Sequence, residues 1–177
     1  MTPLQKIAMG LLIIVLVADF NGWDGLPNPL GWLLVIAGVR AASSHLGNSL
    51  ALTVLAWTAL ATSVLTYPPA VDEELDQAAT WLLGLPQLGF EVVLCSSLAA
   101  VLGHRGRRFR TLSVVLVLVG LGPAIAIGSE SSTAADVTLA GWILSQLALI
   151  WMLFSASGHP ETGAKLRPVR PTAESAE

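Results

Sequence analysis

One acidic residue, Glu91, lies deep inside an apolar stretch that is predicted to form a membrane-spanning helix over residues 78–102. It falls about 13 residues into that helix, and a rise of roughly 1.5 Å per residue puts it near the middle of a bilayer. An ionised carboxylate at that depth costs about 2.5–3.5 kcal/mol on insertion scales. We therefore expect Glu91 to face other helices and to be neutral or hydrogen-bonded there, as in proton relays and solute-contacting sites.

Polar and small side chains recur at spacings of three and four on this helix, and so they share one of its faces. These residues are Thr80, Gly84, Gln87, Glu91 and Cys95. Partners available on other predicted spans are Gln146 and the threonine face Thr58, Thr62 and Thr66. Two interpretations stay open: Glu91, Gln87 and Gln146 form an intramembrane polar site, or Glu91 only bonds to a neighbouring helix and holds the bundle together.

A second group of acids, Asp19 and Asp24, flanks the first connection that is predicted to face outward. Together with Asn21 and Asn28 they could bind a cation or another ligand in an outer-loop site. Residues of these types in a Gly- and Pro-containing stretch also form ordinary turns. The spacing matches no metal-binding motif, so both interpretations remain open.

The sequence lacks the motifs of most enzyme classes. The chain has no Gly-rich phosphate loop, no serine nucleophile elbow and no pair of intramembrane carboxylates. Cys95 is the single cysteine, and the three histidines lie far apart along the sequence. We therefore predict a protein that is not an enzyme, with no catalytic residue, no cofactor and no metal site.

The elements that position these residues are predicted from composition. Hydrophobic residues make up 54% of the chain and charged residues 12%, whereas a soluble domain is about 25% charged. The apolar runs are residues 4–20, 29–42, 46–67, 78–102, 111–128 and 137–157. The predicted fold is an all-α, polytopic transmembrane bundle of six spans over residues 1–157, followed by a disordered cytoplasmic tail over residues 158–177.

The basic residues predict the orientation of this bundle. All nine fall in the same set of alternate connections: Lys6, Arg40, Arg105, Arg107, Arg108, Arg110, Lys165, Arg167 and Arg170. Such asymmetry predicts that the protein lies in the cytoplasmic membrane with both termini on the cytoplasmic side. The four arginines of residues 105–110 could also bind anionic lipid headgroups, although their ordinary role is to hold a loop inside. Nucleic acid is not a predicted partner.

Aromatic, proline and glycine residues add detail. Trp23, Trp32, Trp81 and Trp142 map near the predicted outer boundary, where amphipathic rings prefer to lie. Pro86 and Pro123 interrupt two spans and predict kinks. Two pairs of small residues, Gly38 with Ala42 and Gly120 with Ala124, permit close approach of helices.

Residues 18–32, ADFNGWDGLPNPLGW, resemble the first outer loop of uncharacterised small multi-pass membrane proteins of high-GC Gram-positive bacteria. The resemblance covers under a tenth of the chain. It implies a bacterial cytoplasmic membrane and assigns no activity and no functional residue.

Two functional hypotheses follow from these patterns. The first is a non-enzymatic subunit or interaction partner in a membrane assembly, because the short connections leave little chain for an activity of its own. The alternative is a small-solute transporter or ligand-binding membrane protein that uses Glu91, with Gln87 and Gln146 lining the site.

Overall fold

A computed structural model of the chain describes residues 1–16, 19–20, 23–24, 27–68, 71, 75–129 and 132–158. This part of the chain is built mainly of six helices, so the predicted all-α class is confirmed. They are α1 (Pro3–Val15), α2 (Asn28–Ala42), α3 (Ser49–Leu65), α5 (Gln77–Leu102), α6 (Arg107–Ser129) and α7 (Ser132–Ser157). A 3₁₀ turn, η1 (Gly103–Gly106), joins α5 to α6. The predicted tail lies outside the described residues from residue 159 onward.

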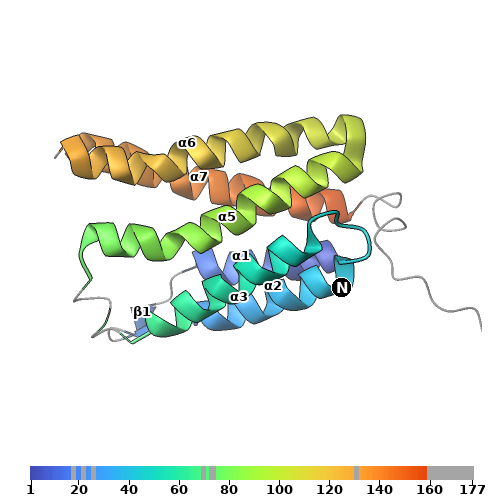
Figure 1. Cartoon of the computed structure of the whole chain (residues 1–177), viewed down its shortest axis with the longest axis horizontal. Helices are drawn as coiled ribbons and strands as arrows, with labels where there is room; N and C mark the ends of the chain where they lie inside the picture. The colour runs from blue at the N-terminus through green and yellow to red at the C-terminus, as the bar shows by residue number, and fades with distance from the viewer. Residues whose placement is uncertain are drawn as a thin grey trace, which may run out of the picture.

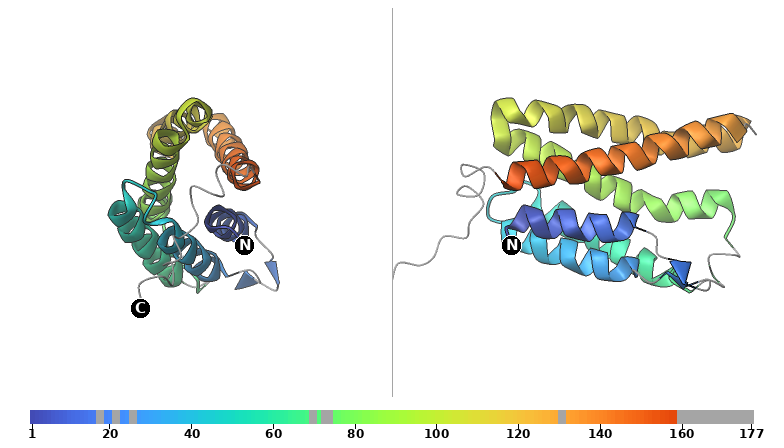
Figure 2. Two further views of the ribbon diagram at one scale, coloured as in Figure 1. Left: turned by 90° about the vertical axis from the view of Figure 1, so that its right-hand side faces the viewer. Right: turned by 180° about the vertical axis from the view of Figure 1, so that it is seen from behind.

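The helices run alternately up and down and close into a ring. Each helix packs against the next one along the chain, and α7 returns to pack against α1. Figure 1 shows the alternation, and the end-on view at the left of Figure 2 shows the ring. The start of α1, the end of α2 and the start of α6 consequently lie at one end of the molecule.

Local sequence signals begin and end the helices. Thr2 and Gln5 form a capping box: the Thr2 hydroxyl accepts from the Gln5 backbone N–H (3.2 Å), and Gln5 Oε1 accepts from the Thr2 N–H (2.9 Å). The carboxylate of Asp76 caps α5 by accepting from the Ala79 N–H at 2.7 Å. At the other end of α5, Gly103 adopts φ +55°, a conformation that favours glycine.

The predicted first span is too long at its C-terminal end. Helix α1 ends at Val15, and the backbone of β1 (Asp19–Phe20) pairs antiparallel with β2 (Trp23–Asp24). The sequence signal that this prediction overlooked is Asn21-Gly22 between two aromatic residues, the dipeptide most typical of a tight β-hairpin. The other predicted spans each coincide with a helix whose ends differ by a few residues.

Helix length divides the ring into two halves. Within the described residues, three stretches are long and apolar enough to cross a membrane: Gln77–Leu102, Arg107–Ala126 and Asp136–Ser157. Helices α1, α2 and α3 have 13, 15 and 17 residues. At roughly 1.5 Å per residue they reach about 20–25 Å, less than the ~30 Å hydrocarbon core of a bilayer. The three longer helices are therefore compatible with membrane insertion.

The distribution of side chains is inverted relative to a water-soluble protein. Large apolar side chains point outward on the long helices, among them Leu118, Ile125 and Trp151. The side chains of Glu91 and Gln146 are instead fully buried. An exterior of this kind suits hydrocarbon, because it exposes apolar surface and removes polar groups from it.

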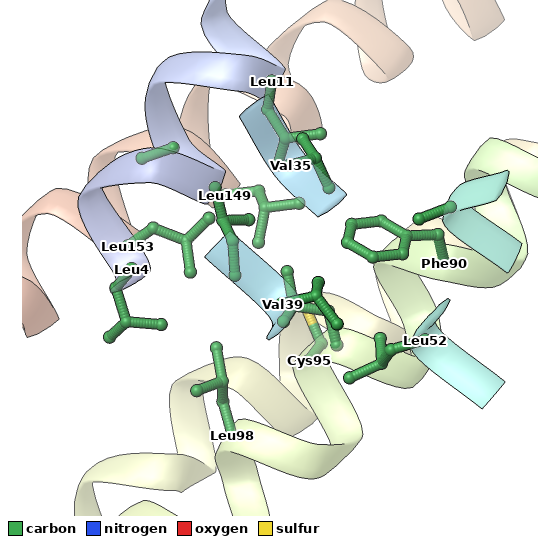
Figure 3. Packing of buried hydrophobic residues seen from close by; sticks show 14 of the residues in the cluster. Leu4, Leu11, Val35, Val39, Leu52, Phe90, Cys95, Leu98, Leu149 and Leu153 are labelled. Carbon is green, nitrogen blue, oxygen red and sulfur yellow. The ribbon is translucent and has the colours of Figure 1, made fainter. Parts of the chain in front are cut away.

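Buried apolar side chains from α1, α2, α3, α5 and α7 converge in the middle of the ring (Figure 3). Trp32 of α2 and Phe90 of α5 meet edge to face, with ring centroids 5.4 Å apart. Trp32 is only 2% exposed, so its ring faces the interior of the protein, and its position near the outer boundary stays a prediction. Its indole fills the interior because the face of α2 that carries it is turned toward α5.

Glycines bring α1 and α2 into close contact. An ideal Cβ atom on Gly10 would lie 2.5 Å from the carbonyl oxygen of Gly31, and one on Gly31 would lie 2.7 Å from the carbonyl oxygen of Gly10. At Gly38 the nearest backbone atom to such a Cβ would be the Pro3 carbonyl oxygen, at 2.9 Å. Only glycine permits this separation of the two backbones.

We predict that Gly31→Ala destabilises the protein by about 1–3 kcal/mol, the usual cost of overpacking. The added methyl group would meet the Gly10 carbonyl oxygen, which cannot move without shifting α1. Gly128→Ala is the matched control, because a Cβ at that helical glycine meets nothing within 4 Å. Unfolding in detergent measures both variants, and equal stability of the two would contradict the packing argument.

Candidate functional site

Glu91 is fully buried, and both oxygens of its carboxyl group accept hydrogen bonds from glutamine amides. Gln87 Nε2 donates to Glu91 Oε1 at 3.0 Å. Gln146 Nε2 donates to Glu91 Oε2 at 2.7 Å. The structure thus brings together the three residues of the predicted intramembrane polar site, and we call them the Glu91 cluster.

The ring explains how these residues meet. Gln87 and Glu91 are four residues apart on α5, so they share a helical face. Gln146 comes from α7, which is not the sequence neighbour of α5. Phe90 contacts Trp32 of α2, while the next residue, Glu91, reaches Gln146. Two consecutive residues of α5 thus connect this helix to α2 and α7, neither of which is adjacent to α5 along the chain.

The predicted alternative partners of Glu91 do not take part. The hydroxyls of Thr58, Thr62 and Thr66 each donate to a backbone carbonyl of their own helix, at 3.0–3.1 Å. This local bonding is common for threonine in helices and leaves the side chain without a need for a partner on α5. Of the two alternatives that the sequence left open, the structure has Gln146 as the partner of Glu91 and not the threonine face.

The cluster stabilises a polar group where water is scarce. Two amide donors replace part of the hydration that a carboxyl group loses on burial. The Oε1 atom of Gln146 is also buried and has no hydrogen-bond partner among the described residues. The Gln146 amide therefore has one acceptor oxygen that no bond within the described protein uses. A contact that only holds two helices together does not require such an oxygen.

A cavity of about 510 Å³ lies between α5, α6 and α7, and we call it the α5–α7 cavity. Its walls are Leu75, Gln77, Thr80, Trp81, Gly84, Leu85, Gln87, Leu88, Val119, Gly120, Pro123, Ala126, Thr138, Leu139 and Trp142. Most of these side chains are apolar, and none of the described lining residues is charged. Gln87 lines the cavity and donates to Glu91, so the cavity and the Glu91 cluster adjoin.

A hydrogen bond joins the two walls of the cavity that α5 and α6 form. The indole N–H of Trp81 on α5 donates to the carbonyl oxygen of Gly120 on α6 at 2.9 Å. A Cβ atom at Gly120 would collide with Leu88, so glycine permits α5 and α6 to approach there. Sequence reasoning indicated close packing at Gly120 but did not find the cavity. The available signal was the joint occurrence of Trp81, Trp142 and Pro123 near one end of three successive helices.

The two acids of the predicted outer-loop site are described only in their backbone. Asp19 and Asp24 are directly opposite in the register of β1 and β2, and Asn28 begins α2. Asn21 and the side chains of the two acids lie outside what the structure describes. In the described part of the chain no three His, Cys, Asp or Glu residues are grouped so as to hold a metal ion. A ligand site at this loop stays a prediction.

The chain was compared with protein families, curated proteins and solved structures. No family model, no curated protein and no solved structure matches it. Function is therefore argued from the geometry of the site itself.

We predict that Gln146→Leu destabilises the protein by about 1–3 kcal/mol, because Glu91 Oε2 then lacks a donor in an apolar interior. The double variant Glu91→Leu with Gln146→Leu should lose less than the two single losses combined. Ser145→Ala is the control, since that hydroxyl donates only to the Trp142 carbonyl of its own helix. Unfolding in detergent provides the double-mutant cycle, and strict additivity would contradict a direct coupling.

Proposed function

We propose that this chain is a multi-pass protein of a bacterial cytoplasmic membrane, with all six helices embedded and both termini on the cytoplasmic side. The outward-facing apolar side chains of the long helices support embedding. The short helices α1 and α2 are packed side by side against the others, so they can lie at membrane depth without matching the full hydrocarbon thickness.

The distribution of charge supports the orientation. Arg40 is in the last turn of α2, and Arg107, Arg108 and Arg110 begin α6 at the same end of the ring. The acid Asp76 caps the start of α5, which lies at the end of the ring opposite to these arginines. Basic residues gathered at one end are typical of the cytoplasmic side of a membrane protein.

Anionic lipid headgroups fit the basic end as partners. Helix α6 begins with three arginines and has no acidic residue in its first turn. The N-terminus of a helix carries partial positive charge, so this placement is unfavourable unless negative charge lies nearby. Headgroups at a cytoplasmic surface supply that charge at about 1 kcal/mol per basic residue.

We further propose that the protein binds a small molecule in the α5–α7 cavity, which makes the ligand-binding or transport hypothesis the better supported one. The observation that carries it is Gln87, which lines the cavity and also donates to the buried carboxyl group of Glu91. Ligand sites are typically concave spaces of about 300–1,000 Å³ with apolar walls and a few polar groups that fix orientation. This cavity of about 510 Å³ has those properties.

The subunit hypothesis stays a prediction beside this proposal. Exposed apolar side chains such as Leu118 and Trp151 suit a partner helix, but they suit lipid equally well. Gentle extraction from native membranes through a tag on the C-terminus tests it. A membrane protein that co-purifies in fixed stoichiometry would support a subunit, and a solitary protein would count against one.

The orientation predicts opposite labelling of two engineered cysteines. In intact cells, Ala78→Cys near the start of α5 should react with a membrane-impermeant maleimide, because that end faces outward. Ser44→Cys between α2 and α3 should react only after the membrane is opened. The parent chain is the control, since its one cysteine, Cys95, is buried. The reverse pattern would contradict the proposed orientation.

The cavity predicts that a bulky side chain at Gly84 displaces the ligand without harming the fold. Gly84 lines the cavity, and a Cβ atom there would meet nothing within 4 Å. We expect the parent protein, purified from its own membrane, to carry a small molecule that Gly84→Phe has lost. Gly128→Phe, at a helical glycine that is equally open but does not line the cavity, should retain it.

Mass spectrometry of organic extracts of the purified proteins measures this loss, and unfolding of the same samples checks that the fold is intact. A ligand retained by both variants, or found in none of the three proteins, would contradict the proposed function.

A further inference from the structure

The chemistry of the cavity wall restricts its ligand, an inference that rests on the proposed ligand-binding function. We infer that the α5–α7 cavity takes an uncharged, mainly apolar molecule that carries a hydrogen-bond donor, such as an aliphatic or isoprenoid alcohol. Three observations support this class: the absence of charge among the described lining residues, the engagement of two wall donors in bonds within the protein, and the orientation of the Gln87 amide.

A charged ligand would find no counter-ion in the described wall. The lining residues comprise apolar side chains, two glutamines and two threonines together with the indole rings of Trp81 and Trp142. The acids nearest to the lining residues along α5 are Asp76, next to Gln77, and Glu91, three residues after Leu88, and neither lines the cavity. The Asp76 carboxylate caps α5, and both oxygens of Glu91 accept from glutamine amides. An ion moved into such surroundings loses its hydration without compensation, so a neutral ligand is favoured.

Two donors of the wall already form hydrogen bonds within the protein. The Thr80 hydroxyl donates to the Asp76 carbonyl oxygen at 3.0 Å. The indole N–H of Trp81 donates to the Gly120 carbonyl oxygen. These two bonds take two donors of the wall, and the Thr80 oxygen can still accept a hydrogen bond.

The orientation of the Gln87 amide also leaves an acceptor for a ligand. A carboxylate oxygen accepts hydrogen bonds, so its partner on Gln87 must be the amide nitrogen, and this bond fixes which way the amide group is turned. The amide oxygen of Gln87 and its second N–H are then the groups left for a ligand. An alcohol can donate to that oxygen and accept from that N–H, whereas an ether of the same size can only accept.

The cavity wall includes an apolar side chain that is accessible from outside the protein. Leu139 lines the cavity and is 60% exposed. With the helices embedded as proposed, a mainly apolar molecule in the bilayer can reach the wall at this side chain.

Competitive photo-labelling tests the inference. The protein in lipid nanodiscs is exposed to an aliphatic alcohol that carries a diazirine, and the labelled peptides are identified. Decanol, decyl methyl ether and decanoate compete at equal concentrations in the membrane. We expect labelling within the cavity segments of α5, α6 and α7, and decanol to compete about 3- to 10-fold better than the ether, the usual effect of one hydrogen bond. Decanoate should compete least.

Variants assign this preference to Gln87. Gln87→Leu should bring decanol and its ether to equal competition, whereas Gln77→Leu, a glutamine of the same wall that is not bonded to Glu91 in the described contacts, should keep the preference. Equal competition by alcohol and ether in the parent protein would overturn the inference, whether or not the variants fold. Labelling that Gly84→Phe leaves unchanged would instead overturn the proposed ligand-binding function.

Discussion

The structure depends on a carboxyl group that is buried in the middle of a helical ring and satisfied there by two amides. In a bilayer, burial of apolar surface gives no net attraction between helices, because lipid tails are as apolar as leucine. Directional bonds and close packing have to supply the association instead. The bond from Gln146 to Glu91 joins α7 to α5 across the ring, and it links the last helix to one that is not its sequence neighbour.

Close packing supplies the rest, and it depends on glycine where two backbones meet. At the α1–α2 contact the backbone of each helix occupies the space that a side chain of the other would need. At the α5–α6 contact Gly120 receives Leu88 and offers its carbonyl oxygen to Trp81. The first contact is a close packing of two backbones, and the second adds a hydrogen bond.

Sequence patterns predicted the parts of this arrangement that depend on a single helix. The spacing of Gln87 and Glu91 identified a polar face, and Gln146 was one of two partners that the sequence left open for Glu91. The end of α1 was missed because a hydropathy pattern runs through residues that prefer a hairpin. The buried position of Trp32 and the α5–α7 cavity could not be predicted, because they depend on how helices are rotated and which ones meet across the ring.

The unequal lengths of the helices connect the fold to the candidate site. Helices α5 and α7 each have 26 residues, twice the length of α1. The cavity is lined by residues of α5, α6 and α7 and by Leu75 just before α5, with no described residue of α1 or α2 in its wall. The long helices continue beyond the end of α1 (Figure 1), so α1 contributes no side chains to the interior of the ring at that level. The same difference in length that leaves α1 short of a full membrane span thus leaves space beside Gln87, directly next to the buried carboxyl group.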